Sequence, residues 1–178
     1  LGYEKIPNKA FDLKKNNVAS VTSETQKIKR QIKELLVSRN IMEIISWSFS
    51  NKKWEENVTG NTDNFEIQNP ISEELSCLRQ TLLGGLLNIV NKNNNKDRQN
   101  ISIFEIGPVF TGIYPGEQKD RLTIIRSGKA IDKNWTAKNR NYDVFDIKSD
   151  LISLLRLLKI PLDKIKIKNE NNNLFHPG

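Results

Sequence analysis

The amino-acid sequence predicts an α+β domain in which a mainly antiparallel sheet is flanked by helices. Several stretches concentrate or alternate β-branched and aromatic residues, as strands do. The links between these strands are mostly of hairpin length, which favours antiparallel pairing. Longer stretches repeat apolar residues at helical spacing. A chain of 178 residues is long enough for one main core and too short for several domains.

The sequence divides into a lead-in segment and one domain. Residues 1–20 have no sustained periodicity, so we expect them to belong to the end of a preceding domain. Residues 21–178 carry the periodic stretches and should form the core. Position 1 is not Met, and residues 174–178 resemble the start of an unfinished strand. We therefore expect a piece of a longer protein, truncated at its C-terminal end.

The first predicted elements are a helix and a strand. Ser23 and Gln26 form a capping box that opens a helix over 24–39. The apolar residues at helical spacing on it are Ile28, Ile32, Leu35 and Leu36. In the strand at 45–49, apolar residues alternate with serines, which predicts that Ile45, Trp47 and Phe49 share one buried face. Ser50 should cap a short helix that reaches Trp54.

The middle of the chain predicts strand, helix and strand. Residues 65–68 form a short strand that stops at Asn69-Pro70. A buried helix follows over 81–91, where Gly84 and Gly85 each cost about 1 kcal/mol relative to alanine, so something should pack closely against them. Residues 101–110 form a buried strand with a predicted kink at Gly107-Pro108.

The last third predicts two strands, a helix and an edge strand. A turn at 114–116 leads into a strand at 121–128. Residues 142–147 form another strand, and an amphipathic helix runs from Ile147 to Pro161. The alternating lysines of 164–168 are typical of an edge strand.

Composition indicates a soluble, cytoplasmic protein and excludes several kinds of site. Apolar residues make up 37% and charged residues 28% of the chain, with no apolar run near the roughly 20 residues that span a bilayer and no signal-peptide pattern. One cysteine and one histidine exclude a disulfide framework and a Cys/His zinc site. Cys77 lies among leucines and is expected to be a buried thiol rather than a nucleophile paired with His176, which is expected in a turn.

Charge and aromatic residues leave an RNA-binding alternative open. The net charge of +7 suits a polyanion, but the lysines are spread along the chain in a composition that also suggests coding bias. Trp47 and Phe49 are expected in the core rather than as base-stacking platforms, and Trp135 is expected at the surface. The carboxylates Asp143, Asp146 and Asp150 are interpreted as helix-start groups rather than metal ligands.

Several segments follow one another in a fixed order along the chain. After the opening "LGYEKIP", these segments are "NPISEELSCLRQTLLGGLL", "ISIFEIGPVF", "YDVFDIKSDLISLL" and "FHPG". Their order resembles that in the bacterial phenylalanyl-tRNA synthetase beta subunit family. The resemblance implies a class II aminoacyl-tRNA synthetase-like core that lacks the chemistry. In catalytic relatives a strand like 101–110 continues into Phe-Arg-any-Glu, whereas here Phe110 precedes Thr111, Gly112 and Ile113. Neither Thr111 nor Ile113 replaces the lost charges.

The resemblance also implies a vestigial pocket and no catalytic or metal-binding residue. Arg79 would lie where catalytic relatives bind substrate, and if buried it needs a carboxylate, for which Glu105 is the candidate; the alternative is that both side chains reach solvent. The predicted pocket residues are Arg79, Thr81, Glu105, Thr111 and Ile113.

For the whole enzyme the resemblance implies an alpha-beta heterotetramer that attaches phenylalanine to tRNA(Phe) with ATP and magnesium. This chain would hold no cofactor, would be inactive alone, and would be a scaffold that contacts the alpha subunit through residues 24–50. The predicted contact residues are Ile28, Ile32, Leu35, Leu36, Trp47 and Phe49. Two alternatives stay open: an active adenylate-forming synthetase domain, and a stand-alone basic RNA-binding module.

Overall fold

The computed structural model describes residues 2–8, 21–60, 62, 65–131, 135–136, 138–168 and 175. Of the predicted lead-in segment it describes only 2–8, which hold the short 3-10 helix η1 (Tyr3–Lys5) and are exposed. Most of the unfinished strand at 174–178, including His176, lies outside the described residues. None of the described helices combines the length and apolar character needed to cross a membrane.

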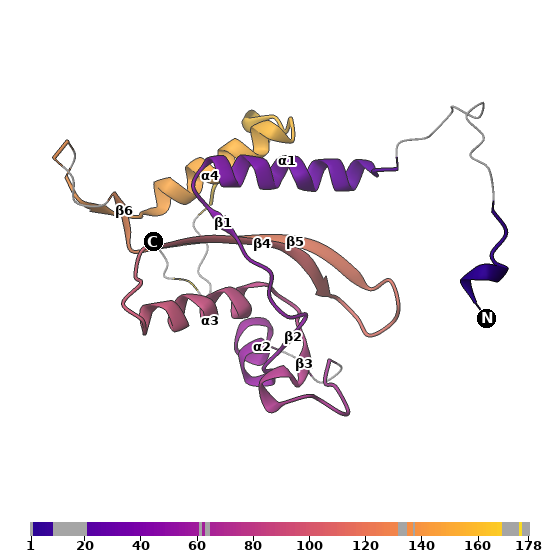
Figure 1. Ribbon diagram of the computed structural model, residues 1–178. Coiled ribbons are helices and arrows are strands. Elements are labelled where there is room, and N and C mark those ends of the chain that lie inside the picture. Colours follow the sequence, from indigo (N-terminus) through magenta and orange to yellow (C-terminus); the bar gives the residue numbers. More distant parts are fainter. Residues whose placement is uncertain are drawn as a thin grey trace.

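A long hairpin forms the centre of the fold. β4 (Ile101–Phe110) and β5 (Gln118–Ser127) pair antiparallel along their whole length, from Ile101 opposite Ser127 to Phe110 opposite Gln118. The short β1 (Met42–Glu43) pairs with β4 in parallel, so the sheet order is β1-β4-β5 and the sheet is mixed. Figure 1 shows this sheet lying between two layers of helices.

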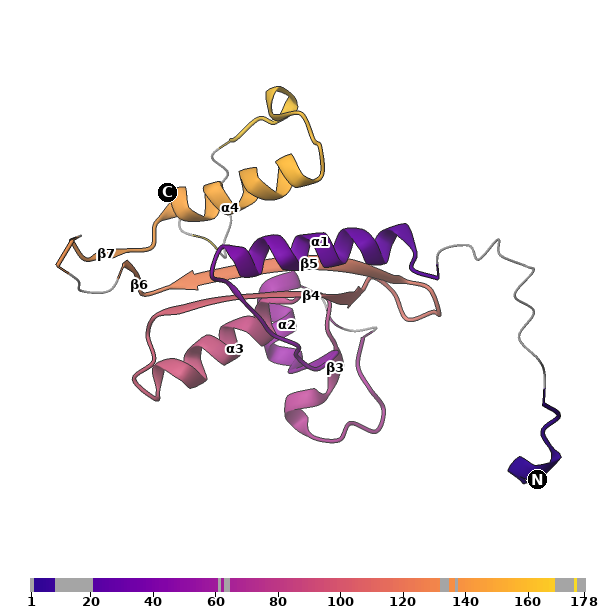
Figure 2. The same ribbon diagram turned by 45° about the horizontal axis from the view of Figure 1, so that its top comes forward.

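Two helices cover one face of the sheet. α1 (Glu24–Ser38) and α4 (Val144–Leu157) lie over the face that carries Phe104. Figure 2 shows them side by side above β4 and β5, and the two helices are in contact. The core of this layer consists of Leu36, Ile41, Phe104 and Leu154, with Ile32, Leu35, Ile106, Leu122 and Ile124 packed around it.

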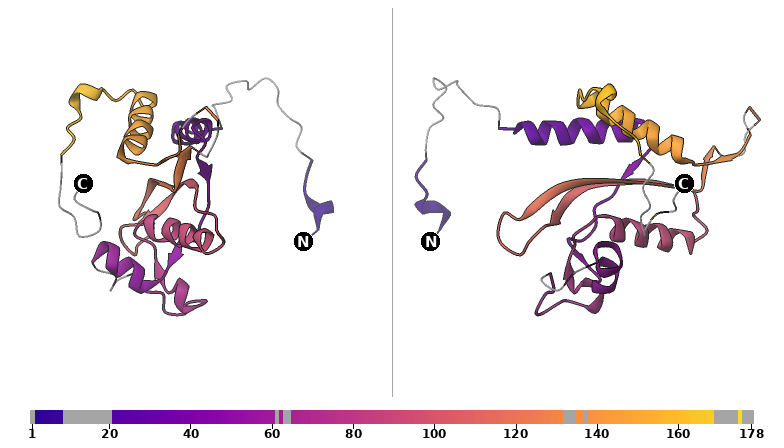
Figure 3. Two further views of the ribbon diagram at one scale, coloured as in Figure 1. Left: turned by 90° about the vertical axis from the view of Figure 1, so that its left-hand side faces the viewer. Right: turned by 180° about the vertical axis from the view of Figure 1, so that it is seen from behind.

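The opposite face packs on α3 (Leu83–Asn94). Strand residues alternate between the two faces, so the neighbours of Phe104 point towards this helix. The core here consists of Leu82, Leu86, Val90, Ile101, Ile103 and Val109. Beside α3 lie α2 (Lys52–Thr59) and a two-stranded sheet of β2 (Phe49–Ser50) and β3 (Cys77–Leu78), which the left view of Figure 3 places on the far side of the main sheet from α1 and α4.

Local sequence explains where the covering helices begin and end. Ser23 and Asp143 both cap their helices through complete capping boxes, with Gln26 and Asp146 as the reciprocal partners. α1 ends in a Schellman motif in which Asn40 has φ 59° and Ile41 N–H donates to Leu36 O. The Ser23 capping box and the helix over 24–39 are thereby confirmed.

Three strand predictions are wrong. At 142–147 the Asp143 capping box overrides the β-propensity of the apolar residues, so α4 begins there and only the short β7 (Arg140–Asn141) precedes it, paired with β6 (Lys129–Ile131). Residues 162–164 form the 3-10 helix η3 (Leu162–Lys164), and 165–168 have no strand pairing. The stretch at 65–68 is reduced to a single bridge between Glu66 and Cys77.

Two further predictions on strands need correction. The ladder between β4 and β5 runs without a break through Gly107 and Pro108, so no kink interrupts the strand. The Pro108 carbonyl and the Phe110 N–H both bond with Arg79, which shows that this edge of β4 faces away from β5 and that the missing donor of Pro108 removes no ladder bond. The predicted strand at 45–49 is confined to Phe49, in β2.

Candidate functional site

An ion pair between Arg79 and Glu105 lies on the α3 side of the sheet. Arg79 Nη1 is 2.7 Å from Glu105 Oε1, and the two side chains are 5% and 2% exposed. Arg79 follows β3, and Glu105 occupies the centre of β4 on the face turned towards α3. The predicted pairing is therefore present, and the alternative in which both groups reach solvent is excluded. In a buried setting each charge needs the other, because an unpaired charge there is costly.

Backbone and serine groups complete the coordination of this pair. Arg79 Nε donates to Pro108 O at 2.9 Å, while Nη1 also donates to Ser46 Oγ at 3.0 Å and Trp47 O at 3.3 Å. Ser46 Oγ donates in turn to Glu105 Oε2 at 2.7 Å. The guanidinium is thus held by internal acceptors on two segments that are distant in sequence, 46–47 and β4.

Gly107 leaves room for the guanidinium on the strand. A Cβ atom at this position would lie 2.4 Å from Arg79 Nη2, closer than any ordinary contact. The glycine before Pro108 is therefore explained by the close approach of a side chain rather than by a kink.

The segment 45–49 has the predicted alternation but the opposite orientation. Ser46 points inward to the ion pair, whereas Ile45 and Trp47 are 88% and 70% exposed. The buried polar pair needs hydrogen-bond partners, and serine supplies them where an apolar side chain could not. The expectation that Trp47 packs in the core is wrong, and Phe49 is half-buried.

A second buried carboxylate, Glu55, lies next to this cluster. Glu55 is on α2, is 1% exposed, and accepts a hydrogen bond from the Gln80 N–H at 2.9 Å. Burial raises the pKa of its carboxyl above the ordinary value, against the opposing effect of hydrogen bonds from Gln80, Ser50 and Thr81. The sequence analysis missed Glu55 because this residue lies in a polar stretch, which is typical of a solvent-exposed helix.

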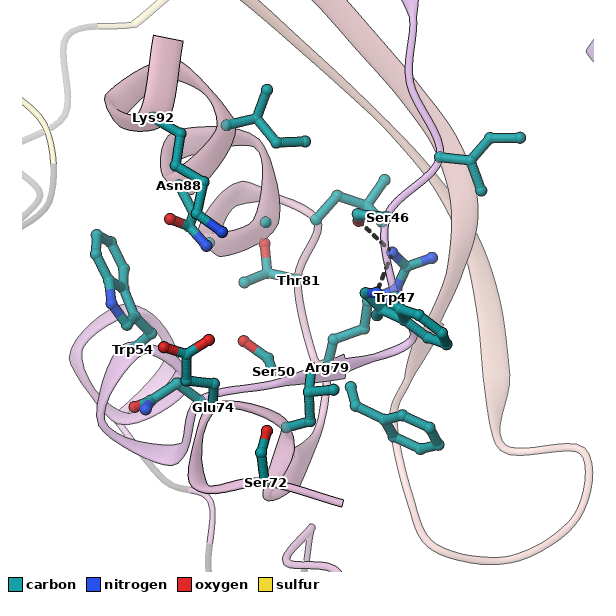
Figure 4. Close-up of a pocket in the computed structure, with 18 residues that line it drawn as sticks. Ser46, Trp47, Ser50, Trp54, Ser72, Glu74, Arg79, Thr81, Asn88 and Lys92 are labelled. Atoms are coloured by element: carbon teal, nitrogen blue, oxygen red, sulfur yellow. Dashed lines mark hydrogen bonds between the residues drawn. The ribbon is translucent and has the colours of Figure 1, made fainter. Parts of the chain in front are cut away.

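These elements surround an open pocket of about 470 Å³ between α2, α3 and the segment 45–51. Figure 4 shows Trp54, Glu74, Asn88 and Lys92 around its opening, while the Arg79 guanidinium points along one wall towards Ser46 and Trp47. Arg79 is the buried cation in this wall of the pocket, and its Nε and Nη1 groups already donate to acceptors within the protein.

The structure brings together only part of the predicted pocket. Arg79 and Thr81 line it, and Glu105 lies behind Arg79 without lining it. Thr111 and Ile113 do not line it. They lie in the turn between β4 and β5, where Thr111 N–H donates to Glu117 O and Ile113 is 56% exposed. Neither residue contributes a charge to the site.

The predicted contact residues divide by burial. Ile28 is 43% exposed, and Ile32 and Leu35 are partly buried against the core under α1. Leu36 is fully buried, so its assignment to a subunit contact is wrong: it belongs to the core with Phe104. Other exposed apolar residues lie in or near this region, and the sequence analysis did not single them out for contact. They include Val37, Met42, Ile45 and Trp54.

Other candidate residues have structural surroundings. Burial raises the pKa of the Cys77 thiol to about 11, so it is protonated at neutral pH and is not a nucleophile. Asp143 and Asp146 form the α4 capping box, as expected of helix-start groups. Trp135 is 97% exposed. Within the described part of the chain, no group of three His, Cys, Asp or Glu residues could hold a metal ion.

Asp150 joins three elements rather than capping a helix. It is fully buried, with Oδ1 2.6 Å from Arg39 Nε and Oδ2 2.6 Å from Arg126 Nε. Burial alone would raise the pKa of Asp150, but hydrogen bonds from Arg126 and Arg39 outweigh it and lower the pKa. Arg126 also lies over the Tyr142 ring, 5.0 Å from its centre.

Comparison with known proteins gives consistent matches. A family model described as the phenylalanyl tRNA synthetase beta chain CLM domain matches residues 12–178. Phenylalanine–tRNA ligase beta subunits are 32% identical over 83% of this chain in Chromobacterium violaceum, 36% over 83% in Ehrlichia canis and 33% over 99% in Burkholderia lata. The chain spans only 18%, 19% and 22% of those relatives, about a fifth of their length.

A solved structure is similar in fold. A pyrrolysyl-tRNA synthetase from Desulfitobacterium hafniense superposes with a TM-score of 0.55 at 12% sequence identity, covering 78% of this chain and 48% of that one. At this identity the likeness concerns the fold alone. It agrees with the α+β architecture predicted from the sequence.

Proposed function

Since the chain belongs to the family of phenylalanyl-tRNA synthetase beta chains, whose CLM domain matches residues 12–178, we propose that it is a non-catalytic scaffold that contacts the alpha subunit of a phenylalanine–tRNA ligase. The whole enzyme would join phenylalanine to tRNA(Phe) with ATP and magnesium in the cytoplasm. This chain would hold neither nucleotide nor metal, and the chemistry would take place on the alpha subunit.

One observation carries the non-catalytic part of the proposal. Arg79 Nε and Nη1 are bound to Pro108, Ser46, Trp47 and Glu105. A guanidinium that stabilises a phosphate must offer its donors to that phosphate. Here rebuilding such a site would mean breaking a buried ion pair. Thr111 and Ile113, in the β4–β5 turn, add no charge.

The exposed apolar residues of the first third of the chain support a protein contact. Ile45 and Trp47 are 88% and 70% exposed, and Met42 is 69% exposed. Large apolar and aromatic residues of this kind are enriched where proteins meet, and stable subunit contacts commonly bury over roughly 2,000 Å². The contact we propose runs from Ile28 on α1 through Trp47.

Co-expression with the alpha subunit of the same organism tests the contact. We expect a complex that survives size-exclusion chromatography, and we expect Trp47→Ser to weaken it at least tenfold. Trp135→Ser is the matched control, because Trp135 is also an exposed tryptophan and lies outside the proposed contact. Failure to form a complex, or an equal loss with both variants, would refute the contact.

An exchange assay tests the missing chemistry. The chain alone should not exchange pyrophosphate with ATP in the presence of phenylalanine, whereas its complex with the alpha subunit should. Exchange by the isolated chain would instead favour an active adenylate-forming domain.

A further inference from the structure

We propose that the exposed cations of α4 and of the residues that follow it bind the phosphate backbone of a structured RNA. This α4 cationic surface consists of Lys148, Arg156, Lys159, Lys164, Lys166 and Lys168. The inference rests on the function proposed above, because tRNA is the RNA that such an enzyme would bring to this module.

The positive charge of this surface is not neutralised locally. All six side chains are exposed, and none forms an ion pair with another residue that the structure describes. Of the carboxylates between 144 and 168, Asp146 is bound by Arg140, and Asp150 is buried between Arg39 and Arg126. Asp163 alone is both exposed and outside the described ion pairs. The surface therefore carries a strong excess of positive charge.

The neighbouring helix shows the opposite arrangement. α1 also carries several cations, but each is close to a carboxylate: Lys27 to Glu24, Lys29 to Asp120, Arg30 to Glu34 and Lys33 to Glu43. The two helices lie side by side on the same face of the sheet (Figure 2). A composition bias towards lysine would affect both helices equally, so it does not explain why only one of them lacks counter-charges.

The cations of α4 and η3 lie in one region because the chain turns back at the end of the helix. Lys159 has φ 56°, and the Ile160 N–H donates to Leu155 O in a Schellman motif. η3 then contacts α4. Lys148 and Arg156 are eight residues apart, about 12 Å along the helix axis. A small anion cannot reach both, whereas successive phosphates of a nucleic acid can.

A basic helix can also bind an anionic membrane, and the exposure of the apolar residues on this surface bears on the choice. Leu151 and Leu158, which lie among these cations, are 48% and 40% exposed. A membrane-surface helix presents a fully exposed apolar face opposite its charges. The partial burial of these leucines against the fold favours the phosphate backbone of RNA. Phe145 and Ile167, each 69% exposed, lie at the two ends of the surface and could contact lipid, so the vesicle comparison below tests the choice.

Two variants with the same change in net charge test the proposal. The α4 variant carries Lys148→Gln, Arg156→Gln, Lys164→Gln and Lys166→Gln. The α1 variant carries Lys27→Gln, Lys29→Gln, Arg30→Gln and Lys33→Gln. Fluorescence anisotropy with a labelled tRNA(Phe) transcript gives the Kd from 50 to 200 mM salt. At about 100 mM we expect the α4 variant to raise Kd at least tenfold and to lower the slope of log K against log salt by about 3, and the α1 variant to change Kd less than threefold.

The outcomes separate this proposal from the preceding one. Circular dichroism should show that both variants fold, and the α4 variant should still form the complex with the alpha subunit. Equal effects of the two variants, no tRNA binding by the unaltered chain, or tighter binding to phosphatidylserine vesicles than to tRNA would overturn the RNA proposal. Normal tRNA binding without an alpha-subunit complex would instead count against the proposed function.

Discussion

At the residue scale, Arg79 and Glu105 form a buried ion pair on which stability should depend strongly. Removing one partner leaves the other charge buried without a counter-ion. We expect Arg79→Met, or Glu105→Leu, to lower the free energy of unfolding by about 3–5 kcal/mol. The double variant should cost clearly less than the sum of the two, because it leaves no charge behind. Urea unfolding followed by tryptophan fluorescence measures all three.

The matched control is an exposed ion pair in the same chain. Arg30 lies 2.9 Å from Glu34 on α1, and both side chains are mostly in water. Arg30→Met should change the free energy of unfolding by at most about 0.5 kcal/mol. Additive effects of Arg79→Met and Glu105→Leu would show that the buried pair is not coupled.

We expect Glu55 to make the free energy of unfolding depend on pH. Its pKa is raised in the folded state, so the folded protein binds the proton more readily than the unfolded chain. The resulting stability is fully present below the unfolded carboxyl pKa of about 4.3 and is lost as pH rises through the higher folded pKa. Glu55→Gln cannot ionise. We expect wild type to lose stability relative to this variant as pH rises across that interval, measured by urea unfolding at successive pH values; a constant difference would contradict this.

Sequence reasoning found the buried pair of Arg79 and Glu105 but missed Glu55 and the role of Ser46, for identifiable reasons. Arg79 and Glu105 each interrupt an apolar stretch, so their burial and pairing could be predicted. The alternation around Ser46 gives the period of an extended segment but not the face that turns inward. That choice depends on the ion pair beneath it, which only the folded structure supplies.

At the element scale, the two glycines of α3, Gly84 and Gly85, have different surroundings. A Cβ at Gly85 would lie 2.9 Å from Ser46 Oγ, which confirms that something packs closely there. A Cβ at Gly84 would meet only Glu55 and Ser50 oxygens at 3.8 Å, an ordinary distance. Close packing therefore explains one glycine of the pair.

This difference predicts opposite effects of the same substitution. Gly84→Ala should raise the free energy of unfolding by about 0.5–1 kcal/mol, because alanine is the better helix former. Gly85→Ala should lower it, because Ser46 is held by Arg79 and Glu105 and cannot move away freely. Thermal unfolding compares the two variants directly. A higher stability of both would show that the Ser46 side chain moves away from the new methyl group.

Elements with strong and unopposed local signals were predictable. Elements in which a helix cap competes with strand propensity, or in which pairing joins distant segments, were not. The helix at 24–39 and the strand at 101–110 match α1 and β4 closely. The apolar residues of 142–147 have strand propensity, yet Asp143 and Asp146 start a helix there, a competition that propensity alone does not resolve. Parallel pairing of β1 with β4 joins strands far apart in sequence, and no local pattern indicates it.

At the scale of the whole molecule, Asp150 connects the helical layer to the sheet. Its two oxygens bind Arg39 at the end of α1 and Arg126 on β5. We expect Asp150→Ala to lower the free energy of unfolding by about 3–5 kcal/mol, because two cations lose their common partner in a buried setting. Hydrogen exchange should then accelerate first in α4, whereas uniform acceleration across α3 and α4 would contradict a local role.

The same carboxylate bears on how the protein is made. During synthesis, α1 and the β4–β5 hairpin leave the ribosome before α4 does. In that interval Phe104 lacks its contact with α4, and Arg39 and Arg126 lack Asp150. A nascent chain halted in this window would be a natural client for chaperones. Completion of α4 would then mark the moment at which the polypeptide can leave them.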